Sequence, residues 1–216
     1  MVSHFRDWLD EAHQLDFAFE TGEFAEALTD RRSGETLDKE RVWPLLGQFF
    51  EGEMHRQTPV PGAIEALGKI GEVADIVILT NLPELAHPWR VDQLASHGIR
   101  HEVVCNQGGK GVPARAIVDR HGAKATVFVD DLAVHHASVA KHAPEVHRLH
   151  MVAEPLLAPA VPPADDAHAR AAEPDTGRVV GARARDRRCA QRARRSAVPI
   201  GCREAEHGER RLSTAA

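Results

Sequence analysis

Polar residues follow two apolar stretches of the chain in a pattern that could perform chemistry. Thr80 and Asn81 end one such stretch, and Asp130 and Asp131 end another. Continuous apolar runs bounded by polar turns are typical of parallel strands covered by helices on both faces. Ligands collect outside the carboxyl ends of the strands in open α/β sheets. We therefore expect these four side chains to meet at one edge of a sheet.

Lys110 lies between these two stretches, in the glycine-rich segment 106–111. Glycines allow the backbone to approach a ligand closely. The segment is not a P-loop, because it lacks the required glycine spacing and has Gly111 where a Ser or Thr would hold magnesium. A hydroxyl, an ammonium group and two carboxylates at one edge predict a site for a phosphate and a metal ion.

The acidic pair Asp130-Asp131 is the most informative of these motifs. Two adjacent carboxylates repel each other and lose hydration on burial, unless a positive group lies close to them. Mg²⁺ held by one or two carboxylates is a common solution. The alternative is that Asp131 caps a helix expected to begin near Ala133. Thr80 alone also fits a strand-ending turn, and Lys110 alone fits a solvated loop.

The middle of the chain alternates strand and helix patterns, which indicates βαβ units and an α/β fold with a Rossmann-like parallel sheet. The rigid segment 58–62 leads into it. The expected strands are 76–79, 101–105, 126–129 and 146–151, and the expected helices are 63–70, one around 91–97, 113–121 and 133–142.

Residues 1–58 are predicted to form a separate small helical segment. Phe5, Trp8, Leu9 and Ala12 share one helical face, and a similar pattern occupies residues 38–52. Ser3 is the expected N-cap of the first helix. No strand is expected before residue 70. The sequence therefore predicts two folded parts, a helical segment at 1–58 and an α/β core at 59–157.

Residues 158–216 are predicted to be a linker followed by a disordered tail rich in Arg and Ala. The stretch from Asp166 to Ala216 has twelve arginines, no lysine and little periodic apolar spacing. Such a segment buries too little surface to offset its ordering entropy. A basic arm for nucleic acid and a slipped reading frame are the alternatives, and the second is preferred.

Composition favours a soluble cytoplasmic protein without a nucleic-acid or membrane partner. The formal net charge is −5, and no apolar run is long enough to span a bilayer. Three cysteines without a C-x-x-C pair fit a reducing compartment. The fourteen histidines show no zinc-binding spacing, so structural roles are expected for them.

The ordered motifs resemble those of the haloacid-dehalogenase-like (HAD) superfamily of phosphohydrolases over residues 59–151. Val-Ile-Leu-Thr-Asn resembles the second motif of that superfamily, Gly-Gly-Lys the third, and Val-Phe-Val-Asp-Asp the fourth. The resemblance implies that Thr80, Asn81 and Lys110 bind the phosphoryl group, with Lys110 offsetting its charge. It also implies that Asp130 and Asp131 bind Mg²⁺, and that residues 1–58 are a helical cap.

The resemblance further implies a nucleophilic aspartate in an Asp-x-Asp motif after a first, central strand. Asp7, Asp10, Asp16 and Asp75 do not follow such a strand. We therefore expect that Met1 is internal to a longer protein, and that the chain as written lacks turnover. The strands ending near Thr80 and Asp130 should then leave unpaired edges about 10 Å apart, twice the usual strand spacing.

The function predicted from the sequence is that of a magnesium-dependent phosphatase of a small phosphorylated metabolite, lacking its nucleophile motif. The alternative is a non-catalytic HAD-like binding or scaffold protein. A response regulator uses similar residues, but there the acidic pair opens the chain.

Overall fold

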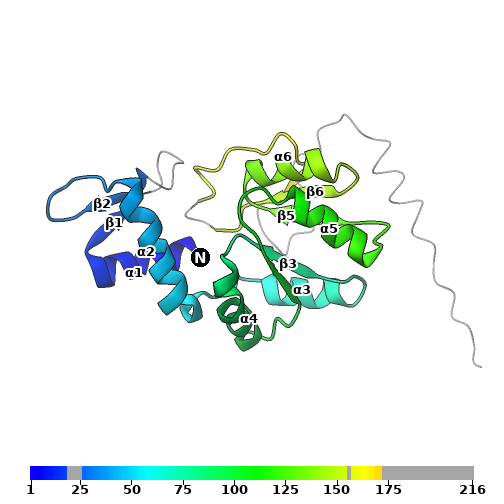
Figure 1. Cartoon of the computed structure of the whole chain (residues 1–216), viewed down its shortest axis with the longest axis horizontal. Coiled ribbons are helices and arrows are strands. Elements are labelled where there is room, and N and C mark those ends of the chain that lie inside the picture. The colour runs from blue at the N-terminus through cyan, green and yellow to red at the C-terminus, as the bar shows by residue number, and fades with distance from the viewer. Residues whose placement is uncertain (19–25, 155–156, 172–216) are drawn as a thin grey trace, which may run out of the picture. The chain divides into compact units, whose positions relative to one another are not determined.

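The computed structural model describes residues 1–18, 26–154 and 157–171 (Figure 1). Contacts within the chain group it into two units, Met1–Ala182 and Arg183–Ala216, and all described residues lie in the first. Within these ranges no helix is both long enough and apolar enough to span a bilayer.

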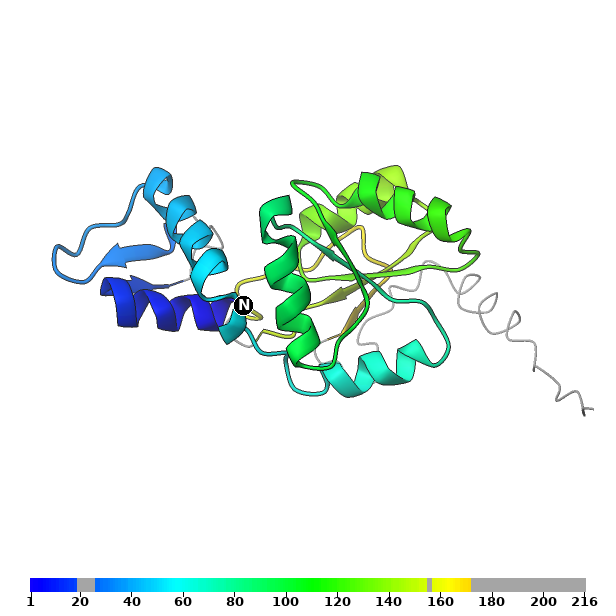
Figure 2. The same cartoon turned by 60° about the horizontal axis from the view of Figure 1, so that its bottom comes forward.

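The α/β prediction is confirmed for the middle of the chain, where strands and helices alternate. The elements in chain order are α3 (Ala63–Gly71), β3 (Val77–Thr80), η4 (Glu84–Ala86), α4 (His87–Ser96), β4 (Glu102–Cys105), α5 (Gly111–His121), β5 (Val127–Asp130), α6 (Ala133–His142) and β6 (His147–Met151). Helices α3 and α4 lie on one side of the strands, and α5 and α6 lie on the other (Figures 1 and 2).

The strands form two parallel sheets. Strand β3 pairs with β4, and β5 pairs with β6, which pairs in turn with β7 (Ala169–Ala171). Among the described residues, no hydrogen-bonded ladder joins β3 to β5. Val127 and Val129 of β5 are 61% and 45% exposed. The strands that carry Thr80 and Asp130 thus each have an edge that no other described strand covers.

A small apolar cluster links the two sheets. It consists mainly of side chains from α5 and α6, including Val118 and Val139. Leu79 of β3 and Phe128 of β5 both pack against it. The helices therefore hold the two strands in one core, although the strands do not pair.

The N-terminal segment contains a β-hairpin, so the prediction of no strand before residue 70 is wrong. Its elements are α1 (Val2–Trp8), the π-helix η1 (Leu9–His13), β1 (Leu15–Phe17), β2 (Leu28–Asp30), α2 (Lys39–Gly52) and η3 (Met54–Arg56). The two strands are antiparallel and three residues long, too short for a clear period-two pattern. The cap prediction is also wrong, because α1 begins at Val2 and Ser3 lies inside its first turn.

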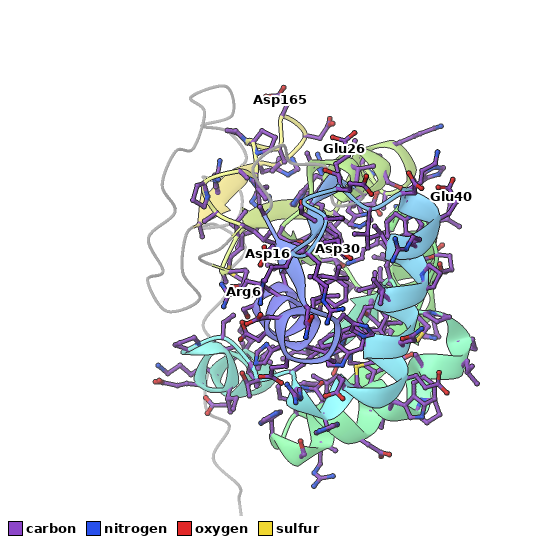
Figure 3. The ribbon with its side chains drawn as sticks, turned by 90° about the vertical axis from the view of Figure 1, so that its left-hand side faces the viewer. Arg6, Asp16, Glu26, Asp30, Glu40 and Asp165 are labelled. Atoms are coloured by element: carbon purple, nitrogen blue, oxygen red, sulfur yellow. The ribbon has the colours of Figure 1, made fainter. Side chains whose placement is uncertain are left out.

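A triad of charges, formed by Arg31, Asp10 and Asp16, lies beside this hairpin. The guanidinium of Arg31 lies 2.5 Å from the carboxylate of Asp10 and 2.6 Å from that of Asp16. Asp16 and Asp30 project from the two hairpin strands (Figure 3). All three groups of the triad are about half exposed, so it contributes little stability.

Aromatic and aliphatic side chains form the core of the N-terminal segment, and later residues complete it. Phe5, Leu9 and Phe49 are fully buried there, and Val152 and Val161 belong to the same cluster. The segment after residue 152 is therefore partly structured by contacts with distant residues.

Residues 158–171 are not the plain linker that was predicted. They include β7, and Arg148 donates hydrogen bonds to the backbone oxygen of Asp166 at 2.7 Å and toward a ring nitrogen of His168 at 3.3 Å. Sequence periodicity missed β7 because a three-residue strand has almost none. The predictions for the tail from residue 172 onward lie outside the described residues.

Phe49 provides a test of the N-terminal core. It is 0% exposed and contacts the rings of Phe5 and Trp8 at centroid distances of 5.3 and 5.7 Å. We expect Phe49→Ala to lower the free energy of unfolding by about 3–5 kcal/mol, measured by urea denaturation. Leu85→Ala is the control, because Leu85 is 75% exposed and should change stability by less than about 0.5 kcal/mol. Similar losses in both variants would contradict this assignment of the core.

Candidate functional site

An ion pair between Lys110 and Asp130 lies at the centre of the candidate site. The Lys110 Nζ atom is 2.7 Å from Oδ2 of Asp130, and the two side chains are only 13% and 4% exposed. The structure thus brings the loop lysine to the first residue of the acidic pair. Lysine, with no metal required, already offsets one of the two carboxylates.

Asp131 retains the unbalanced charge of the pair. Burial and the neighbouring carboxylate of Asp130 raise the pKa of Asp131, while Lys110 acts in the opposite direction. A desolvated carboxylate whose charge is disfavoured is stabilised by any cation that reaches it. Asp131 is therefore the group at this site best suited to attract a cation.

The helix-cap alternative for Asp131 is wrong. The N-cap of α6 is Leu132, and no side-chain hydrogen bond caps this helix. Instead, Oδ1 of Asp130 accepts a hydrogen bond from the Leu132 N–H at 2.9 Å and so turns the chain from β5 into α6.

An amide cluster joins the carboxyl ends of β3 and β4 to the glycine-rich loop. Asn81 donates a hydrogen bond from Nδ2 to the Gly108 carbonyl at 2.8 Å, and Asn106 donates to Oδ1 of Asn81 at 2.9 Å. The Asn106 N–H also donates to the Thr80 carbonyl at 2.9 Å. These bonds fix the start of the loop that carries Lys110.

Thr80 is half-buried at the last position of β3, next to Asn81. Between the hydroxyl of Thr80 and the side chains of Lys110 or the acidic pair, the described part of the chain shows no hydrogen bond. Asn81 approaches the other side of the site, since its Nδ2 lies 3.4 Å from Nε2 of His135. The β3 end is thus tied to the site through Asn81.

Close packing of glycine against α6 positions Lys110. The Gly111 N–H donates a hydrogen bond to Oγ of Ser138 at 2.9 Å. A Cβ atom at Gly111 would overlap the Ser138 carbonyl oxygen. Only glycine permits α5 to begin this close to α6, and Lys110 directly precedes that contact.

Two buried histidines hold the backbone of the acidic pair. His136 and His150 are 0% and 1% exposed. His136 donates from Nε2 to the Asp130 carbonyl at 3.0 Å, and His150 donates from Nε2 to the Asp131 carbonyl at 2.9 Å. Their rings pack edge to face at a centroid distance of 5.4 Å. Each peptide oxygen of the pair therefore has its own ring donor.

Burial favours the neutral form of His135 and His136. Desolvation lowers the pKa of His135 and of His136 from the ordinary 6.5, although Asp130 partly opposes both shifts. The Nδ1 atoms of both rings are buried without a hydrogen-bond partner. Protonating either ring would therefore leave a buried charge poorly compensated.

Asp130 and Asp131 are the side chains at this site that could hold a metal ion. No group of three or more His, Cys, Asp or Glu side chains in the described ranges is arranged to hold a metal ion. Mg²⁺ needs fewer protein ligands, since water and substrate oxygens complete its shell. The raised pKa of Asp131 is consistent with a carboxylate that a divalent cation would stabilise.

Comparisons with known proteins identify no family for this chain, so its function is inferred from the candidate site alone. No protein-family profile matches the sequence, and no curated protein is significantly similar to it.

Asn106 was not singled out from the sequence. Structural roles were expected for the histidines, but the contacts of His136 and His150 were not predicted. Asn106 directly follows the expected strand 101–105 and could have been found by the same rule that found Thr80 and Asn81. His136 and His150 give no local signal, because their contact with the acidic pair depends on how α6 and β6 pack.

Gly111→Ala tests the close approach of α5 and α6. We expect the free energy of unfolding of this variant to fall by about 1–3 kcal/mol in chemical denaturation. The reason is that the new methyl group would overlap the Ser138 carbonyl. The matched control is Gly68→Ala in α3, where a Cβ atom meets nothing within 4 Å. That control should gain about 0.5–1 kcal/mol from helix propensity. Equal effects at both positions would refute the packing argument.

The buried histidines predict a pH dependence of stability. Their folded-state pKa values lie below the unfolded value, so the unfolded chain binds more protons as pH falls through about 6.5. Stability should therefore fall between about pH 7.5 and pH 5.5, by at most about 1.4 kcal/mol per pH unit for each histidine.

Denaturation across this range should show a shallower slope for His136→Gln than for the unmodified protein. His55→Gln is the control, because His55 is exposed and should leave the slope unchanged. A His136→Gln slope identical to that of the unmodified protein would contradict the assignment.

Proposed function

We propose that this chain carries the phosphate- and metal-binding part of a HAD-like phosphohydrolase acting on a small phosphorylated metabolite. The observation that carries the proposal is the buried Lys110–Asp130 pair, with Asp131 beside it and Asn81 and Asn106 in the adjoining amide cluster. A finer description of the fold, as a Rossmann-like HAD core with a small cap at 1–58, and a cytoplasmic location belong to the same proposal.

Each residue has a defined part in the proposed site. Thr80 and Asn81 supply a hydroxyl and an amide to the phosphoryl oxygens. Lys110 supplies positive charge to the same group, and in doing so exchanges part of its contact with Asp130 for the substrate. Asp130 and Asp131 would hold Mg²⁺, which when bound neutralises charge that develops on the phosphoryl group. Positioning and charge stabilisation are the main requirements of phosphoryl transfer.

The position between β3 and β5 is where the proposal places a nucleophile. The two strands each have an uncovered edge, and both pack on the same helices through Leu79 and Phe128. A further strand there would present its carboxyl end between Thr80 and Asp130. No described carboxylate follows a strand in that position, so we expect binding without turnover from the chain as written.

The second candidate is a HAD-like protein that binds a ligand and does no chemistry. The Lys110–Asp130 pair favours it in one respect, because both charges are already matched without a ligand. The two candidates share the binding site and differ only in whether a nucleophile completes it.

Binding of Mg²⁺ and inorganic phosphate tests the shared site. We expect the chain to bind phosphate more tightly with Mg²⁺ than without it, measured by calorimetry. Asp131→Asn should weaken Mg²⁺ binding at least about tenfold, because one charge-assisted ligand is lost. Asp92→Asn, an exposed change on α4, is the control and should bind normally. Mg²⁺ binding that is insensitive to Asp131→Asn would reject the proposed metal site.

Adding a strand separates the two candidates. The chain is extended before Met1 by an apolar strand ending in Asp-x-Asp, and hydrolysis of p-nitrophenyl phosphate is measured with Mg²⁺. A hydrolase predicts activity that is absent with a strand ending in Asn-x-Asn and strongly reduced by Asp131→Asn. If phosphate binds but no such strand yields turnover, the binding protein is the better description.

A further inference from the structure

Arg90 of α4 is a guanidinium held only by neutral groups. It donates from Nη1 to Oε1 of Gln93 and from Nη2 to Oε1 of Gln57, both at 3.0 Å. Its Nε atom is buried and has no hydrogen-bond partner. Both glutamine side chains are themselves buried. Each terminal nitrogen of Arg90 has a second N–H, so donors remain for another acceptor.

The charge of Arg90 lacks a carboxylate partner within the described part of the chain. Several other arginines there pair with acids, such as Arg115 with Asp119 and Glu145. Arg148 is also buried without an ion pair, but backbone carbonyls accept its hydrogen bonds. Burial lowers the pKa of Arg90. Leaving a desolvated cation unmatched is costly, so proteins normally pair it or use it to bind an anion.

Arg90 lies at the same edge of the strands as the proposed phosphate site. Trp89, which precedes Arg90, and Cys105 pack against the same apolar cluster. Cys105 is the last residue of β4 and directly precedes Asn106 of the amide cluster.

We propose that Arg90 binds a carboxylate carried by the phosphorylated substrate. This inference rests on the proposed function and narrows it to phosphate esters of small organic acids. A planar guanidinium with free N–H groups matches a carboxylate in shape and charge. Gln57 and Gln93 hold the guanidinium in place without neutralising it, which leaves its charge for the ligand. Arg90 would then select the substrate, while Lys110 and the acidic pair engage its phosphate.

Paired ligands test this selection on the full chain with Mg²⁺. Phosphoglycolate is compared with ethyl phosphate, and phosphoglycerate with glycerol phosphate, because the members of each pair differ chiefly in the carboxylate. We expect the carboxylate to tighten binding about tenfold or more in at least one pair, measured by calorimetry. Arg90→Gln should abolish this preference and leave binding of ethyl phosphate unchanged.

Gln57→Glu is the sharper variant, because it places a carboxylate against Arg90 and keeps the oxygen that accepts its hydrogen bond. The exchange gives up only the weak contact of Gln57 Nε2 with Sδ of Met54, at 3.4 Å. We expect the protein to remain folded by thermal melting and to lose the carboxylate preference. Arg100→Gln, an exposed change just beyond α4, should retain the preference.

The possible outcomes separate the two proposals. If the esters bind and Lys110→Met weakens them, but the carboxylate adds no affinity, the role of Arg90 is refuted and the proposed function stands. A preference that survives both Arg90→Gln and Gln57→Glu also refutes it, and leaves Arg90 as a tether between α4 and Gln57. If no ester binds, both proposals fail.

Discussion

The candidate site depends on how buried charge is balanced at the ends of β4 and β5. Asp130 and Asp131 are adjacent in sequence, so their carboxylates cannot be separated by the fold. Lys110 compensates Asp130 at 2.7 Å, and the raised pKa of Asp131 shows that its own charge remains disfavoured. Asp131 therefore carries an unbalanced negative charge next to the matched Lys110–Asp130 pair.

Neutral contacts keep this charge arrangement rigid. His136 and His150 bind the two peptide oxygens of the acidic pair, and the Gly111–Ser138 contact fixes the start of α5 beside Lys110. None of these contacts supplies charge to a ligand. They restrict where the charged groups can move, which is the condition for electrostatic stabilisation without reorganisation. Neutral groups also position a charged group at Arg90, where two glutamine side chains orient the guanidinium without neutralising it.

The sequence predicted those features that depend on local patterns. The apolar runs before Thr80 and Asp130 indicated strands, and the rule that parallel strands end at one edge predicted the meeting of Lys110 with the acidic pair. The hairpin β1–β2 and the strand β7 were missed because three residues carry almost no periodicity. The contacts of His136, His150 and Arg90 could not be predicted, because they depend on how the helices pack against the strands and loops. The charge of Arg90 is unusual only once its surroundings are known.

The two separate sheets show that assembly of the binding groups does not require a continuous sheet. Leu79 and Phe128 pack on one cluster of α5 and α6 side chains, and this fixes the ends of β3 and β5 relative to each other. This arrangement leaves strand edges unpaired and leaves the side chains of Val127 and Val129 exposed. Open strand edges and exposed apolar side chains favour pairing with another strand. A strand that pairs with either edge would gain backbone hydrogen bonds. Under the proposed function, the described residues would supply ligand binding, and a strand between β3 and β5 would supply the nucleophile.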